Sequence, residues 1–105
     1  MNTHMDALET RAPAEREAAL LAALPAQIAH AQKNAPAFAE ALKGINAAEI
    51  TSRAALAKLP VVRKYELLEK QKASRAAGAS VFGGFSAVGF GKHMPRVFSS
   101  PGPIY

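Results

Sequence analysis

Residues 20–42 read LLAALPAQIAHAQKNAPAFAEAL and carry the clearest structural pattern of this 105-residue chain. Apolar side chains recur there at every third or fourth position, at Leu20, Leu24, Ile28, Ala31, Ala35, Phe38 and Leu42. A helix with about 3.6 residues per turn places positions with this spacing on one face. The sequence therefore predicts a helical segment that packs through one continuous apolar face.

Two prolines fall inside this run, and each removes a backbone donor and restrains the residue before it. We therefore expect breaks or kinks near Leu24, before Pro25, and near Ala35, before Pro36. The predicted pieces span residues 13–24, 25–34 and 36–43, with Gly44 as a left-handed cap after the last one.

The next residues predict shorter helices with recognisable caps. Asn46 is expected to cap a short turn through Ile50, and Ser52 is a good N-cap for a helix of one or two turns. We expect that helix to turn Leu56 and Leu59 inward and to end at Pro60. A further helix is predicted from about Arg63 to about Lys72, with Leu67 and Leu68 on its apolar side.

The fold class is therefore predicted to be mainly α, with three parts. Residues 1–12 are expected to form a flexible N-terminus, residues 13–73 a bent helical segment, and residues 74–105 a Gly/Ser/Pro-rich connector. That connector is expected to end in one short strand near Arg96 to Ser100. An isolated strand is unstable because its backbone groups need a partner. We therefore expect the chain to be the first part of something larger.

Composition narrows the classes of function. The chain has no cysteine, which excludes disulfides and thiolate chemistry, and it carries a formal net charge of +5. No apolar run approaches the roughly 20 residues of a membrane span, and the N-terminus lacks the pattern of a secretory signal. We expect a cytoplasmic protein without a membrane partner.

Residue order suggests a family. The step NAPAF at residues 34–38 is followed by LAKLPVVRKYEL at residues 56–67. This order resembles the start of phenylacetate–CoA ligases, a branch of the adenylate-forming, AMP-forming acyl-CoA ligases. The resemblance covers roughly residues 20–100, and it implies that the chain is only the opening piece of a larger α/β adenylate-forming domain. It implies a parent enzyme that activates a carboxylic acid with ATP and magnesium and then transfers it to coenzyme A.

The family's nucleotide loop would fall at the end of the chain. Ser99, Ser100 and Gly102 match the beginning of a loop that surrounds ATP phosphates with backbone N–H groups and hydroxyls. Pro101 and Pro103 depart from that pattern because each lacks a donor. A turn that ends a strand is the alternative interpretation. No catalytic or metal-binding residue is predicted, because the family's other motifs are missing from this sequence.

Other motifs have simple explanations. Residues 83–92 are Gly-rich, but their spacing does not match a Walker motif, and we interpret them as a flexible connector. The basic residues Arg63, Lys64, Lys70, Lys72 and Arg75 form a run that is interpreted as a solvated face. Lys64 is either a phosphate contact or a solvated lysine at a helix start. We do not expect nucleic acid as a partner, since no recognised module or stacking aromatic accompanies the run.

The resemblance implies that this segment is structural and inactive alone. Its expected partner is the remainder of a ligase, or another copy of itself, bound through the apolar helical face. The alternative is a stand-alone, non-catalytic helical interaction protein.

Overall fold

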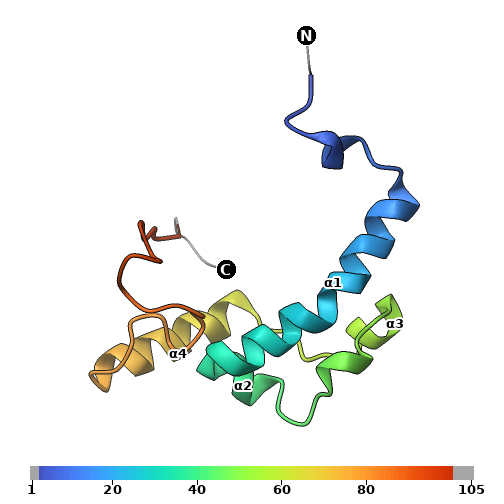
Figure 1. Ribbon diagram of the computed structural model, residues 1–105. Coiled ribbons are helices and arrows are strands. Elements are labelled where there is room, and N and C mark those ends of the chain that lie inside the picture. The colour runs from blue at the N-terminus through green and yellow to red at the C-terminus, as the bar shows by residue number, and fades with distance from the viewer. Residues whose placement is uncertain (1–2, 101–105) are drawn as a thin grey trace.

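The computed structural model describes residues 3–100, and it is mainly helical, as predicted. In chain order the elements are η1 (Ala7–Thr10), α1 (Pro13–Asn34), α2 (Pro36–Ala41), η2 (Ala47–Glu49), α3 (Arg53–Leu56) and α4 (Lys64–Ala76), where η marks a 3-10 helix (Figure 1). No helix within residues 3–100 combines the length and apolarity needed to cross a bilayer.

The long helix α1 corrects one prediction. It continues through Pro25, so no break occurs near Leu24 and the predicted pieces 13–24 and 25–34 form one helix, whose axis bends along its length (Figure 1). Pro25 removes the hydrogen bond that its position would donate to the carbonyl of Leu21. The alanines and leucines on both sides are strong helix formers, and the buried Ile28 anchors the next turn in the core. These contributions keep one proline from ending the helix.

The break predicted at Ala35 is confirmed. Ala35 has φ −119° and ψ 103°, outside the helical region, and Pro36 starts α2 as its first helical residue. The helix α2 ends at Ala41, slightly before the predicted position, and Gly44 adopts the expected left-handed conformation with φ +81°. The chain therefore folds back, and α2 packs beside the C-terminal half of α1 (Figure 1).

The core lies where α1, α2 and η2 meet. Its buried residues are Ile28, Leu42 and Ile50, and Ala35 is also buried, at 2% exposure. Apolar side chains packed against this cluster are Leu24, Ala31, Phe38, Ile45, Ala47, Ala55 and Leu59. Two residues that were expected to face inward do not, since Leu20 is 62% exposed and Leu56 is 43% exposed. The predicted apolar face is therefore covered only from Leu24 onward.

A side-chain amide fastens the end of α2 to α1. Gln32 donates from Nε2 to the carbonyl of Leu42 at 3.1 Å and to the carbonyl of Ile45 at 2.9 Å. Carbonyls at the C-terminus of a helix lack partners within that helix. The Leu42 carbonyl also accepts from the Ile45 amide at 3.1 Å, so Gln32 adds a second bond there and supplies the donor for the Ile45 carbonyl. These bonds fix the loop that brings Ile50 into the core.

The predicted caps of the short helices are confirmed. The Asn46 side chain accepts a hydrogen bond from the Ala48 amide at 3.2 Å and starts η2. The Ser52 hydroxyl accepts from the Ala55 amide at 3.1 Å and starts α3. These bonds satisfy amides that have no partner within the helix.

The last helix starts where predicted and runs further. At its start the Arg63 amide donates to the Glu66 carboxylate at 3.0 Å, and α4 continues beyond Lys72 to Ala76. It ends in a Schellman motif, in which the Gly78 amide bonds the Arg75 carbonyl at 3.0 Å with φ +73° at the glycine. This turn directs the following chain back along α4.

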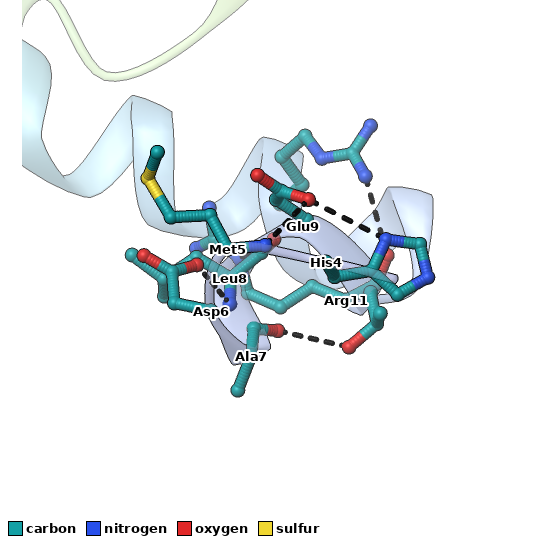
Figure 2. Close-up of polar contacts among 9 residues, drawn as sticks. His4, Met5, Asp6, Ala7, Leu8, Glu9 and Arg11 are labelled. Carbon is teal, nitrogen blue, oxygen red and sulfur yellow. Dashed lines mark hydrogen bonds and ion pairs between the residues drawn. The ribbon is translucent and has the colours of Figure 1, made fainter. Parts of the chain in front are cut away.

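The N-terminal residues hold a short element that the sequence analysis did not predict. The Asp6 carboxylate accepts from the Leu8 amide at 2.8 Å and caps η1 (Figure 2). Glu9 accepts from the Met5 amide at 3.2 Å and lies 3.4 Å from His4 Nδ1 (Figure 2). The flexibility of residues 1–12 and the division into three parts stay predictions.

The short strand is not observed in the part of the chain that the structure describes. Residues 94–100 have no regular secondary structure, and no strand occurs anywhere within residues 3–100. A strand needs a second strand to bond with, and the described residues supply none. The remaining residues of the expected turn, 101–105, lie outside the described range.

We expect Pro25→Ala to raise the free energy of unfolding by roughly 1–3 kcal/mol, because it restores a donor in the interior of α1. Urea denaturation followed by circular dichroism measures this change. Pro13→Ala is the matched control, since Pro13 occupies the first turn of the same helix, where its donor would have no partner. Equal effects of the two substitutions would contradict this interpretation.

We expect Gln32→Ala to lower the free energy of unfolding by roughly 1–3 kcal/mol, because the Ile45 carbonyl loses its donor and the Leu42 carbonyl keeps only the Ile45 amide. The same denaturation experiment applies. Gln27→Ala is the control, as Gln27 is an exposed glutamine on the same helix. An unchanged midpoint for Gln32→Ala would show that the amide does not hold α2 in place.

Candidate functional site

Two of the three predicted nucleotide-loop residues border a cavity beside α4. Ser99 and Ser100 are exposed and line a hollow of about 410 Å³. Gly102 lies outside the described residues. The other lining residues are Lys64, Leu67, Leu68, Gln71 and Arg75 from α4, and Val81, Phe82, Val97 and Phe98 from the Gly-rich segment. We call this hollow the α4 cavity.

Two glycines dock the Gly-rich segment on the helices. Gly83 has φ +64°, and a Cβ atom placed on it would lie 3.1 Å from the backbone of Gln71 in α4. Gly84 has φ +83°, and its Cβ atom would lie 3.0 Å from the Ala37 nitrogen. The Gly84 carbonyl accepts a hydrogen bond from that same amide at 2.9 Å. Glycine is therefore required here for close approach and for backbone conformation.

Aromatic contacts reinforce this docking. Phe85 packs edge-on against Phe38 of α2 with 5.4 Å between ring centroids, and Lys70 Nζ lies 5.9 Å from the Phe85 centroid. Phe82 contacts Phe90 at 5.2 Å. The sequence analysis interpreted residues 83–92 as a connector, but their first part is packed between α2 and α4. These contacts give the α4 cavity a second wall.

The donor set of the α4 cavity does not fit magnesium–ATP. Magnesium in such sites is held by carboxylates together with phosphates, and no carboxylate side chain is among the described residues that line this cavity. Lys64 and Arg75 are separated by about 16 Å along α4, too far to bind one phosphate group together. In residues 3–100 no group of three or more histidine, aspartate or glutamate side chains gathers as metal ligands do.

Two apolar grooves flank α3 on another part of the surface. The first, of about 620 Å³, lies between α1 and α3 and is lined by Leu20, Leu21, Leu24 and Leu56, with Arg16, Glu17 and Arg53 among its polar residues. Arg53 and Glu17 form an ion pair beside it. The second, of about 440 Å³, is lined mainly by Ile28, Phe38, Leu42, Leu56, Leu59, Val61 and Val62. We call these grooves together the apolar face.

The apolar face includes residues that the sequence analysis did not single out as exposed. Val61 and Val62 follow the Leu59–Pro60 step, and Val61 is 80% exposed. The sequence could have indicated this exposure. Two consecutive valines directly after a helix-ending proline cannot both turn inward in a short connection, so at least one of them is expected to face solvent. Leu56 lines both grooves, so it joins them into one surface.

Comparisons of the chain with protein-family models, curated proteins and solved structures found no match. The resemblance to phenylacetate–CoA ligases therefore rests on residue order alone.

We expect Gly84→Ala to release the Gly-rich segment from α2. A left-handed conformation costs a residue with a Cβ roughly 1–2 kcal/mol, and the new methyl group would also press on the Ala37 amide. Hydrogen exchange at the Ala37 amide should accelerate roughly 5- to 30-fold.

Gly89→Ala is the matched control for this experiment. A Cβ atom there has no neighbour within 4 Å, and Gly89 does not adopt a positive φ. We expect the Ala37 amide of the Gly89→Ala variant to exchange at the same rate as in the wild-type chain. Equal protection in both variants would show that Gly84 is not a docking point.

Proposed function

We propose that this chain is the N-terminal scaffolding segment of a phenylacetate–CoA-ligase-like enzyme. Its role is to dock on the larger α/β adenylate-forming body through the apolar face. The observation that carries this proposal is the coincidence of two features. The Leu59–Pro60 corner, which belongs to the residue order that resembles the ligases, lies within the same apolar face.

The balance of buried and exposed apolar surface supports docking. The buried core consists of four small or medium side chains, whereas Leu20, Leu56 and Val61 are exposed on one connected surface. A contiguous exposed apolar patch marks an interaction site on a folded protein. Covering it would remove water from side chains that the segment cannot bury by itself.

The chemistry belongs to the whole enzyme in this proposal. ATP would activate a carboxylic acid as an acyl-adenylate, and coenzyme A would then displace AMP. The sites for magnesium, ATP and coenzyme A would lie on the remainder of the enzyme, because the described residues that line the α4 cavity include no carboxylate for magnesium. The segment would be inactive alone, and the enzyme would act in the cytoplasm.

The coding DNA beyond the Tyr105 codon gives the first test. We expect the reading frame to continue into a ligase body, and the complete product to release AMP and pyrophosphate when supplied with ATP, coenzyme A and phenylacetate or another carboxylic acid. An immediate stop codon, or a complete product without carboxylate-dependent AMP release, would overturn the proposal. The stand-alone interaction protein would then be the better interpretation.

A charge placed in the apolar face tests the docking role separately. Leu20→Asp should leave the melting of the 105-residue chain unchanged, because Leu20 is already exposed. In the complete enzyme it should lower the rate of AMP release at least tenfold by weakening the contact with the body. Leu8→Asp is the control, as Leu8 is exposed but does not line either groove. Equal activity of both variants would exclude this face as the docking surface.

A further inference from the structure

The net charge of the chain is confined to its last third. Residues 1–69 contain eight acidic and eight basic side chains, so their formal charges cancel. Residues 70–105 contain no aspartate or glutamate and five basic side chains, Lys70, Lys72, Arg75, Lys92 and Arg96. The whole formal charge of +5 therefore lies in residues 70–105. Such a separation indicates a partner that carries negative charge.

Most of these cations are free to meet a partner. Within residues 3–100, Lys72 alone among the five forms an ion pair, with Glu69 at 3.4 Å. Lys70, Arg75, Lys92 and Arg96 are exposed and form no ion pair in the described part of the chain. Their charges are not neutralised by the fold.

The structure adds aromatic rings to this positive surface. Phe82 and Phe98 line the α4 cavity together with Lys64 and Arg75, and Phe98 is 83% exposed. Phe90, which contacts Phe82, is 73% exposed. In the sequence these rings are distant from the basic run of α4, and only the turn after α4 brings them beside it. Gln71, Ser99 and Ser100 add hydrogen-bonding groups to the same cavity.

The spacing of the charges favours a chain of phosphates over a single nucleotide. Lys64 and Arg75 border the same cavity but lie about 16 Å apart along α4. This spread along the cavity suits a flexible strand, which can place successive phosphates near each cation. Unpaired bases stack on exposed aromatic rings irrespective of sequence. Cations along a groove with accessible rings are the features that single-stranded nucleic acids require.

A membrane surface fits this arrangement less well. Phe82 and Phe98 border a hollow, which admits a strand but not the plane of a bilayer. The leucines of α4, Leu67 and Leu68, are half-buried against the Gly-rich segment, so this helix has no free apolar side to insert.

We propose that the α4 cavity and the cationic surface around it bind single-stranded nucleic acid. Lys64 and Arg75, which line the cavity, contact phosphates, and Phe98 stacks on a base. This inference does not rest on the proposed ligase role, since it uses a different surface from the apolar face.

Fluorescence anisotropy of the 105-residue chain with labelled oligouridine and oligodeoxythymidine tests the proposal. We expect saturable binding whose logarithmic affinity falls with the logarithm of salt concentration with a slope of about −2 to −4. This is the slope for three to five neutralised phosphates at about −0.7 each on a single strand. Binding of either oligomer supports the proposal, and the oligomer that binds more tightly shows whether the preferred ligand is RNA or DNA.

Two variants separate stacking from charge. Phe98→Ala should weaken binding about 5- to 150-fold with little change in salt slope, because it removes only a stacking surface. Arg75→Gln should weaken binding and reduce the slope by about 0.7. Lys43→Gln removes an exposed cation from the neutral part of the chain and should change neither quantity. All three mutated positions lie outside the core, and unchanged melting curves verify that each variant is folded.

Clear results would overturn the inference. One is the lack of salt-dependent binding to either oligomer. A second is binding to vesicles of anionic phospholipid but not to oligomers, which would indicate a membrane surface. A third is complete competition by ATP at equal phosphate concentration, which would indicate a mononucleotide site. Equal losses in Arg75→Gln and Lys43→Gln would exclude the α4 cavity as the location.

Discussion

Pro36 forces the backbone at Ala35 out of the helical conformation, and most of the tertiary structure depends on that single interruption. Because a new helix begins at Pro36, the amide of Ala37 has no partner within α2 and donates its hydrogen bond to the Gly84 carbonyl. The same reversal carries Leu42 onto Ile28 and places the carbonyls of Leu42 and Ile45, just after α2, within reach of Gln32. A continuous helix would have bonded the Ala37 amide to Lys33, and the Gly-rich segment would have lost its anchor.

The two prolines of this region show how far sequence reasoning extends. Both follow apolar residues in a helical pattern, and the local rule predicts an interruption at each. A break occurs at Pro36, where Ala35 is almost fully buried, whereas α1 continues through Pro25 without a break. The difference lies in tertiary packing, because α2 must fold back for its apolar side to reach Ile28. Caps at Asn46 and Ser52 were predictable since they depend on neighbours within a few residues.

The candidate sites were harder to predict from the sequence, because they too depend on tertiary packing. The Gly-rich segment has no hydrophobic periodicity, so nothing in its pattern indicated that Gly83 and Gly84 touch helices. The α4 cavity combines residues of α4 with residues that come after a left-handed turn at Gly78. Ser99 and Ser100 could be selected as polar loop residues, but their neighbours Arg75 and Phe82 depend on long-range packing. Exposure of Leu20 and Leu56 likewise reflects how little of α1 the short helices cover.

The contact between Ala37 and Gly84 also has a consequence for the order of folding. The bonds that close the core are local, since Gln32 and Ile45 are only 13 residues apart in the chain. Local contacts form quickly because little loop entropy is lost on closing them. The Ala37–Gly84 bond closes a much longer loop, so the Gly-rich segment joins a helical unit that has already formed. On the ribosome, α1, α2 and η2 emerge first and assemble before the residues that complete the α4 cavity have been synthesised.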